Sequence, residues 1–386
     1  MPLTRHPSRS RRAAAAVVLL PLLLGACGDD PVPSAGPDAD PTTTRPSPAT
    51  SPSTPTTPPS PPPAQGTPDP SAVQVLVTGL QAPWGIGFLP GGDALVTERD
   101  TARVLRVPAG GGTPTEVTRV REAAPGGEGG LLGLAVSPRF ETDRLVYVYV
   151  TTAADNRVVR FRLDDPARTE AVVTGIPKAR VHNGGRIAFG PDGNLYVGTG
   201  DAGDTALSQD EGSLGGKVLR TTPDGEPVSG GSLVFSKGHR NVQGLAFDDD
   251  GRVYAVEFGQ NRFDEVNVVE QGTNGGWPAV EGPGDGGGRF LAPITTWTTD
   301  EASPSGAALT AGSLWVAALR GERLWRVPLD GRGGAGEPEP LLRGEFGRLR
   351  TAATAPDGSL WVLTSNRDGR GDPTRDDDRV LRLPAR

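Results

Sequence analysis

Apolar and polar positions follow a repeating pattern from residue 71 to the end of the chain. A turn that usually contains glycine precedes a short strand of alternating apolar side chains, and this unit occurs six times. The six copies are FLPGGDALVTER from Phe88, VSPRFETDRLVYVYV from Val136, FGPDGNLYVGTGD from Phe189, FDDDGRVYAVEFG from Phe247, LTAGSLWVAAL from Leu309 and TAPDGSLWVLTSN from Thr354. A second short strand follows each copy, as in RVLRVP from Arg103. The pattern predicts a β-hairpin in every repeat, and helical periodicity is convincing nowhere.

A hairpin of this kind cannot bury both of its faces alone, so the repeats must stack on one another. Sixfold recurrence predicts an all-β fold, a six-bladed β-propeller of four-stranded antiparallel blades, over residues 71–386 and disfavours a β-sandwich. Trp315 and Trp361 occupy equivalent positions in two repeats and are expected to fill the space between blades. The strand VQVLVTGL from Val73 is expected to complete the last blade and so to protect the edge strands.

The N-terminus has the composition of an export signal. Arginines precede an apolar run over residues 13–26, and this run is shorter than the roughly 20 residues that a membrane-spanning helix needs. The run ends at Cys27, the only cysteine of the chain, in a Leu-Gly-Ala-Cys sequence that resembles a bacterial lipobox. We therefore expect residues 1–26 to be a cleaved signal peptide and Cys27 to carry a lipid that anchors an extracytoplasmic protein to the cell membrane. A chance cysteine is the alternative, and the export route, Sec or twin-arginine, stays open.

A stalk is predicted between this anchor and the repeats. Residues 31–70 are almost all Pro, Ser, Thr, Ala and Asp, with hardly any apolar side chain to bury, so residues 27–70 are expected to be disordered. No disulfide can form within the repeats, so their stability must come from packing and from closure of the ring. The formal net charge of −7 is not that of a nucleic-acid-binding protein.

Two histidines, His182 and His239, remain in the chain after Cys27. His182 opens the segment HNGGRIAFGPDG directly before the inner strand of the third repeat. An imidazole there could reach into the axial funnel and act as a general base. It could equally be a structural histidine at a strand end, and its position alone does not decide between these roles.

Four arginines stand at junctions between loops and strands: Arg240, Arg320, Arg348 and Arg350. If they face one funnel, they would repel one another unless a polyanion lay among them and accepted bidentate hydrogen bonds. A second cluster gathers Asp264, Glu265, Glu281 and Asp285 among turn glycines. Calcium takes carboxylate and carbonyl oxygens of this kind, although a solvated acidic loop is as good an interpretation.

The same segments carry a family resemblance. The motifs are QAPWGIGFLPGGDALVTER, GEGGLLGLAVSPRF, HNGGRIAFGPDGNLYVGTGD, GHRNVQGLAF, DEVNVVEQGTNGGWP, the PSG before VAALRGERL, and RLRTAATAPDGSLWVLT. Together they resemble, from about residue 80 to 383, the soluble aldose and glucose/sorbosone dehydrogenases that use pyrroloquinoline quinone (PQQ), a tricarboxylated quinone. The resemblance implies oxidation of an aldose or related sugar at its anomeric carbon by hydride transfer to PQQ, with electrons then passed to an external acceptor.

The resemblance also implies roles for single residues. His182 matches the family's catalytic base, and Arg240 and Asn241 match the pair that contacts the cofactor, with Arg240 near the carbonyl that becomes negative. The remaining matches to cofactor partners are Arg320, Arg348 and Arg350. The matches to calcium sites are the backbone carbonyls of Gly259 and Gln260, and a neighbouring structural site at Asp264, Glu265 and the Gly275 region.

Several positions depart from the family. Glu128 stands where a glutamine beside the cofactor is common, and a carboxylate there would disfavour an anionic ligand unless it were protonated or paired. Phe258-Gly259-Gln260 replaces the more usual His-Gly-Pro, and Gly275 replaces an aromatic residue. Trp297 is our candidate for the aromatic side chain that stacks on sugar or quinone.

Two other functions stay open. A propeller of the same descent could have lost its cofactor and bind a wall glycan or a protein partner, and Glu128 favours this alternative. A calcium-dependent lactonase is the second alternative, in which the metal would activate water. Such a site needs several carboxylates around the axis, whereas the motifs here supply arginines.

Overall fold

The fold is that of a computed structural model, which describes residues 66–228 and 230–386. The expected signal peptide, the lipidation of Cys27 and most of the expected stalk lie outside the described residues. Within the described part of the chain, no helix is long and apolar enough to cross a membrane.

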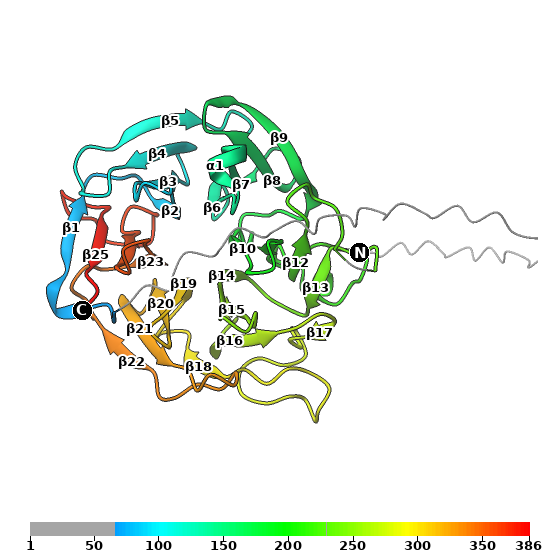
Figure 1. The fold of residues 1–386 in the computed structure, drawn as a ribbon. Helices are drawn as coiled ribbons and strands as arrows, with labels where there is room; N and C mark the ends of the chain where they lie inside the picture. Colours follow the sequence, from blue (N-terminus) through cyan, green and yellow to red (C-terminus); the bar gives the residue numbers. More distant parts are fainter. Residues whose placement is uncertain (1–65, 229) are drawn as a thin grey trace, which may run out of the picture. The chain divides into compact units, whose positions relative to one another are not determined.

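Six β-sheets surround a central axis, which confirms the predicted six-bladed propeller (Figure 1). Blades 1 and 2 are β2 (Pro83–Phe88), β3 (Ala94–Glu98), β4 (Arg103–Val107) and β5 (Thr115–Arg119), then β6 (Leu131–Val136), β7 (Leu145–Thr151), β8 (Asn156–Arg162) and β9 (Asp165–Ile176). Blades 3 and 4 are β10 (Ile187–Phe189), β11 (Leu195–Gly198), β12 (Lys217–Thr221), β13 (Val234–Lys237) and β17 (Thr273–Asn274), then β14 (Val242–Phe247), β15 (Val253–Glu257), β16 (Phe263–Val269) and β18 (Thr295–Thr298). Blades 5 and 6 are β19 (Pro304–Thr310), β20 (Ser313–Ala318), β21 (Arg323–Pro328) and β22 (Glu339–Leu341), then β23 (Leu349–Thr354), β24 (Leu360–Thr364), β25 (Val380–Leu383) and β1 (Gln74–Val77).

Blade 3 departs from the four-stranded pattern, because the two-residue strand β17 pairs in parallel with β13 at its outer edge. Helical structure is confined, within the described residues, to α1 (Phe140–Asp143) and the 3₁₀ turns η1 (Pro70–Ala72) and η2 (Thr205–Ser208). This agrees with the lack of helical periodicity in the sequence.

The two ends of the propeller meet in blade 6, as predicted. Strand β1 pairs antiparallel with β25, and Gln74 faces Arg382 in the register. The contact begins before residue 71, because the amide of Thr67 donates to the carbonyl of Arg386 at 3.2 Å and that of Asp69 to the carbonyl of Pro384 at 2.9 Å. Residues 66–70 are therefore part of the domain and not of the stalk. Their polar composition resembles that of the stalk, so composition cannot reveal these backbone hydrogen bonds.

Apolar side chains fill the spaces between neighbouring blades. Trp361 of blade 6 packs with Ile86 and Val96 of blade 1, and its ring meets Phe88 edge-on at 5.2 Å. Trp315 of blade 5 packs with Leu360 and other residues of blade 6. The predicted role of both tryptophans between blades is confirmed, and this burial supplies the main stabilising force of a ring without disulfides.

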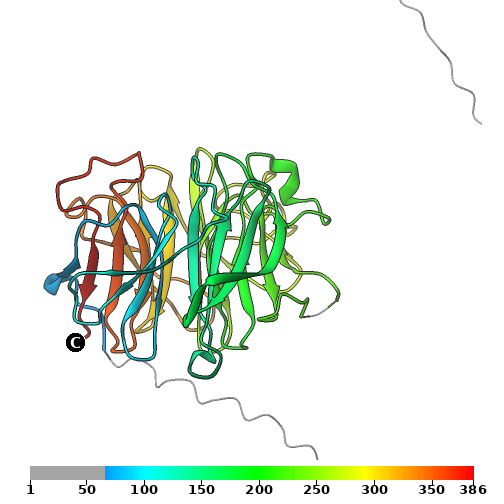
Figure 2. The same cartoon turned by 90° about the horizontal axis from the view of Figure 1, so that it is seen from above.

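The topology decides where loops gather. In each blade the strand nearest the axis follows a loop that comes from the preceding blade. These innermost strands are β2, β6, β10, β14, β19 and β23 (Figure 1). Since neighbouring strands are antiparallel, the start of each innermost strand and the end of the next strand lie at the same end of the propeller. Figure 2 shows the loops at the two ends. Residues just before an innermost strand, such as His182, Arg240 and Arg348, must therefore converge at one end of the axis.

Candidate active site

A cavity of about 500 Å³ opens where these junctions converge. It is lined by Glu128, Val181, His182, Arg240, Phe258, Gly259, Gln260, Asp264, Thr299, Ser303, Leu319, Arg320, Arg348 and Arg370. A smaller cavity of about 150 Å³ shares Glu128, Phe258, Leu319 and Arg370 with it and adds Trp84, Arg99, Gln243, Arg350 and Asp368, with Gly127 and Gly369. The arrangement brings the base candidate and the four arginine candidates to one place.

His182 is bound at both ring nitrogens. Its Nδ1 lies 2.6 Å from Oδ1 of Asp201, and its Nε2 lies 2.8 Å from Nη2 of Arg240. A guanidinium can only donate, so Nε2 carries the lone pair and Nδ1–H donates to Asp201. This tautomer leaves Nε2 as the basic nitrogen on the cavity side.

Asp201 is fully buried just after β11, and no motif in the sequence pointed to it. Besides His182 it accepts hydrogen bonds from the indole of Trp277 at 2.9 Å and the amide of Gly203 at 2.8 Å. Burial by itself would raise the pKa of Asp201, but the hydrogen bonds from His182 and Gly203 outweigh it and lower that pKa overall. Asp201 is therefore an ionised partner that orients the imidazole.

Arg240 lies beside His182 and is only 8% exposed. Its Nε and Nη2 donate to Oε1 of Gln260 at 2.9 and 2.7 Å, and its guanidinium stands 5.7 Å from the ring of Trp277. Burial lowers the pKa of Arg240, which makes an anionic partner favourable. The adjacent Asn241 accepts from the amide of Gly184 at 2.9 Å.

The second histidine has a structural role. His239 is fully buried, its Nδ1 lies 2.7 Å from Glu257, and its Nε2 lies 2.8 Å from Oγ of Ser236. Glu257 also accepts the amide of Arg240 at 2.7 Å. His239 thus fixes the carboxylate that holds the backbone beneath Arg240, while His182 alone of the two lines the cavity.

Arg348 and Arg350 share one carboxylate, Asp368, which no sequence motif indicated either. Nη2 of Arg348 lies 2.9 Å from Oδ2 of Asp368, and Nη2 of Arg350 lies 3.4 Å from the same oxygen. Arg350 also donates to Oε1 of Gln243 at 2.8 Å. Burial lowers the pKa of Arg350 to about 9, so it remains charged at neutral pH. The single negative charge of Asp368 faces the two positive charges of Arg348 and Arg350, so the site keeps an excess of positive charge.

Arg320 lines the larger cavity at its rim. Its side chain is 60% exposed and lies 2.6 Å from Asp300, which is itself 75% exposed. An ion pair in solvent of this kind is weak, so Arg320 is free to exchange Asp300 for another anion. The structure therefore brings Arg320 to the cavity without fixing it there.

Of the two predicted calcium sites, the structure keeps the residues of the first together and separates those of the second. Gly259, Gln260 and Asp264 line the larger cavity, where Asp264 accepts the amides of Gly259 at 2.9 Å and Ser303 at 2.7 Å. Glu265 is the next residue on β16 and so points to the other face, where its carboxylate accepts from Asn267 at 3.0 Å. Gly275 lies elsewhere, where a Cβ atom on it would come within 3.2 Å of the ring of His239. Among the residues that the structure describes, no three His, Cys, Asp or Glu side chains group as metal ligands.

Trp297 was the wrong choice for a stacking residue. It is 4% exposed, belongs to the outermost strand of blade 4, and stacks on Trp325 at 5.5 Å, so it is a core residue between blades 4 and 5. Trp277 is the aromatic residue beside His182 and Arg240. Its indole N–H donates to Asp201, which holds His182, and its ring faces the guanidinium of Arg240. The sequence feature that could have identified Trp277 is its place in the motif DEVNVVEQGTNGGWP.

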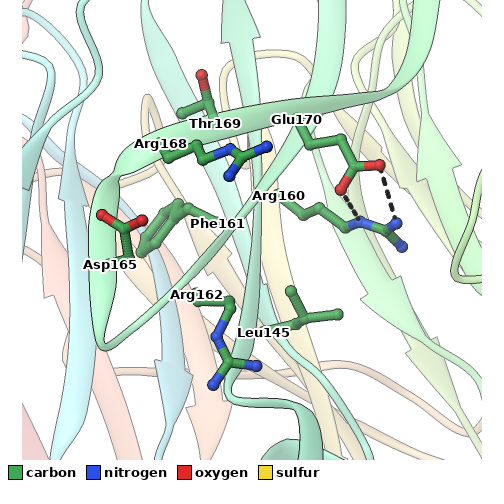
Figure 3. Close-up of a pocket in the computed structure, with 8 residues that line it drawn as sticks. All are labelled: Leu145, Arg160, Phe161, Arg162, Asp165, Arg168, Thr169 and Glu170. Carbon is green, nitrogen blue, oxygen red and sulfur yellow. Dashed lines mark hydrogen bonds and ion pairs between the residues drawn. The ribbon is translucent and has the colours of Figure 1, made fainter.

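A separate hollow of about 410 Å³ lies on the outer side of blade 2 (Figure 3). Two of its three arginines are already paired, since Arg160 lies 3.1 Å from Glu170 and 2.6 Å from Asp224, and Arg162 lies 2.7 Å from Asp164. No histidine lies among its lining residues, and we do not regard it as the active site.

Known proteins resemble this chain over nearly all of the propeller. The sequence model of the glucose/sorbosone dehydrogenase family matches residues 80–375. The structure of the PQQ-bound form of an aldose sugar dehydrogenase from Streptomyces coelicolor is 53% identical, with a TM-score of 0.78 over 84% of this chain and 100% of that one. A putative oxidoreductase (glucose dehydrogenase) from Thermus thermophilus is 43% identical, with a TM-score of 0.75 over 81% and 99% of the two chains. The aldose sugar dehydrogenase YliI of Escherichia coli is 28% identical over 77% of this chain and 91% of its own length.

Fold, cavity and relatives agree on the class of protein, which is an oxidoreductase of the sugar dehydrogenase type built on a six-bladed propeller. The family model covers well over half of the chain. The chain therefore belongs to the glucose/sorbosone dehydrogenase family.

Proposed function

We propose that the protein is a quinoprotein that oxidises an aldose or a related sugar at the anomeric carbon, with His182 as general base and PQQ as cofactor. The observation that carries the proposal is the placement of His182 between Asp201 and Arg240 in a cavity lined by arginines from separate blades. The PQQ-bound relative at 53% identity supports the same cofactor.

The residues present fit a tricarboxylated quinone. Among the described residues, Nδ2 of Asn241 and Nε of Arg350 are buried donors without a hydrogen-bond partner, and an unsatisfied buried donor is costly. A ligand rich in acceptor oxygens would satisfy such groups and would offset the repulsion among Arg240, Arg348 and Arg350. We therefore assign Arg240, Asn241, Arg348 and Arg350 to cofactor binding, together with Arg320 at the rim of the cavity.

When bound, PQQ supplies a two-electron acceptor for the hydride of the substrate. His182 takes the hydroxyl proton at Nε2, once the sugar hydroxyl replaces the Nη2 group of Arg240 there. Asp201 keeps Nδ1–H in place and stabilises the imidazolium that results, and a base so positioned contributes roughly 10²–10⁴-fold. Arg240 supplies positive charge next to the reacting centre.

Calcium is the second proposed cofactor, at the carbonyls of Gly259 and Gln260 with the carboxylate of Asp264 nearby. Burial raises the pKa of Asp264 to about 7, and its hydrogen bonds come from two backbone amides. A buried carboxyl group of this kind fits a divalent cation, which would supply positive charge to the ligand in the cavity. Glu265 and Gly275 are not needed for that site.

We further propose that the enzyme is exported and anchored to the membrane through Cys27, and that it passes electrons to an acceptor outside the cytoplasm. The basic and apolar segments before Cys27 and its lipobox-like context support this.

The test is reconstitution of the purified apoprotein. Dye-linked aldose dehydrogenase activity should appear only when both PQQ and calcium are added, and His182→Ala should abolish it. Arg162→Gln, in the outer hollow of Figure 3, is the control variant and should reconstitute like the wild type. Inactivity across a broad sugar panel, with no heat of PQQ binding, would instead favour a binding propeller, and hydrolysis of lactones without quinone would favour a lactonase.

A further inference from the structure

We propose that Glu128 is a positioning residue for the base His182, and that Arg370 supplies the counter-charge that makes a carboxylate acceptable beside an anionic cofactor. The proposal rests on the function proposed above, because it assigns roles within the same cavity. It explains the departure from the glutamine that is common at this position.

Glu128 belongs to the loop Gly126-Gly127-Glu128-Gly129-Gly130 between β5 and β6, which is pressed against the segment before His182. The amide of Glu128 donates to the carbonyl of Arg180 at 2.8 Å. A Cβ atom on Gly127 would lie only 2.2 Å from that same carbonyl, and the φ of Gly127 is +62°, so this position requires glycine. The loop therefore carries one functional side chain and holds it in a defined place.

Each oxygen of the Glu128 carboxylate has its own partner. Oε2 accepts the backbone amide of His182 at 2.9 Å, and Oε1 accepts from Nη2 of Arg370 at 2.7 Å. His182 has a φ of +53°, a left-handed conformation that a residue other than glycine adopts when its surroundings enforce it. The hydrogen bond from Glu128 is part of that enforcement, so its loss would shift the imidazole relative to the substrate.

The charge of Glu128 has to be offset. Burial by itself would raise the pKa of Glu128, but the His182 amide and the Arg370 guanidinium outweigh it and lower that pKa overall. An ionised carboxylate therefore lines both cavities, where it would repel a tricarboxylated ligand. Arg370 lines both cavities too, and its side chain is 57% exposed at their rim. The ion pair leaves this corner formally neutral, as a glutamine would.

The test is a double-mutant cycle on the holoenzyme and its apoprotein, with Kd for PQQ from calorimetry in the presence of calcium. Arg370→Gln leaves the charge of Glu128 uncompensated, and Kd should rise about tenfold. The double variant Glu128→Gln with Arg370→Gln removes both charges and should return Kd toward the wild-type value. Arg162→Gln, which breaks an exposed ion pair of the same 2.7 Å length on blade 2, is the matched control.

Positioning is tested separately through turnover. Glu128→Ala removes the acceptor for the His182 amide, and kcat should fall about 10- to 100-fold while KM for the sugar changes much less. Glu128→Gln keeps an acceptor oxygen and should recover most of that loss. Unchanged turnover in Glu128→Ala, or equal Kd values for Arg370→Gln and the double variant, would overturn the inference while the proposed function stands. A wild-type protein that binds no PQQ would overturn both; the Arg370 variants change an exposed side chain and so do not depend on the folding of Glu128→Ala.

Discussion

The chemistry of His182 at Nε2 depends on what its other ring nitrogen, Nδ1, contacts. Asp201 holds the Nδ1–H at 2.6 Å, and without that acceptor the ring could turn over or change tautomer. Asp201 is in turn fixed by Trp277 and by the amide of Gly203. A carboxylate that acts through the base is therefore as important to the site as the base.

Asp201→Asn is expected to lower kcat by about 10²–10⁴-fold with little loss of fold. The amide can donate to Nδ1 and so favours the tautomer in which Nε2 bears the proton and cannot accept one. Steady-state kinetics with reconstituted enzyme would measure this, and near-UV circular dichroism would confirm the packing. A variant with wild-type kcat would show that Asp201 does not orient the base.

Lys217 gives a pH dependence that is independent of the active site. The side chain is fully buried, its ammonium donates to the carbonyls of Leu207 and Gly215 at 2.6 and 2.7 Å, and burial lowers its pKa to about 8. The ordinary value of 10.5 applies to the unfolded chain, so between these two values the unfolded state binds the proton that the folded state lacks.

The free energy of unfolding of the wild type should therefore rise from pH 8 to pH 10 relative to Lys217→Met. The variant should be less stable at neutral pH, because its methionine leaves backbone carbonyls without a donor. Chemical unfolding of both proteins at several pH values would measure the difference. Parallel stability curves would show that Lys217 does not titrate in this window.

The sequence could name His182 because only two histidines follow Cys27, and it could name the arginines because they stand at loop-to-strand junctions within family motifs. It could not name Asp201 or Asp368. The chain has 46 Asp and Glu residues, and only the closed ring shows which of them meet His182 or Arg348. Trp297 failed for the same reason, since the sequence does not show that Trp297 packs between two blades while Trp277 lies beside Asp201.

At the scale of elements, the repeats contain an ion pair that the apolar pattern does not show. An arginine of the third strand meets an aspartate of the turn before the second strand in several blades, as Arg106 with Asp93 at 2.7 Å and Arg382 with Asp357 at 2.6 Å. In blade 5 the turn has no aspartate, and Arg326 donates to Ser313 at 3.2 Å. Exposed pairs of this kind contribute at most about 1 kcal/mol each, so they help to fix turn geometry more than stability.

Strand β1, which closes the ring by pairing with β25, is the element on which the ring depends most. Its removal would leave β25 as an unpaired edge, and such edges aggregate. A chain that begins at residue 78 is therefore expected to lose about 3 kcal/mol or more of stability, since each backbone hydrogen bond contributes roughly 1 kcal/mol. A chain that begins at residue 66 is the control and should melt like the full chain. Equal melting temperatures would show that β1 is dispensable for closure.

At the scale of the whole molecule, the architecture was predictable because the same hairpin pattern occurs six times in the sequence. One weak hairpin signal becomes decisive when it recurs, and the need to hide both faces leaves few folds. Features that occur once were not predictable. The extra strand β17 has two residues, and the contact of residues 66–70 with the C-terminus uses backbone groups that any polar sequence could supply.

The cavity also joins the blades, and this leads to a prediction for the molecule as a whole. Glu128, His182, Arg240, Arg320 and Arg348 belong to the loops of five different blades, so a ligand that contacts them must leave before the ring opens. PQQ at about 100 times its Kd should then stabilise the fold by about 2.7 kcal/mol, a rise of several degrees in Tm for a domain of this size. The rise should shrink at high salt, because the contacts are between opposite charges. Differential scanning calorimetry with calcium alone, with PQQ and calcium, and with citrate as a tricarboxylate without a quinone would measure it. A Tm that PQQ leaves unchanged would mean that the arginines of separate blades do not share one ligand.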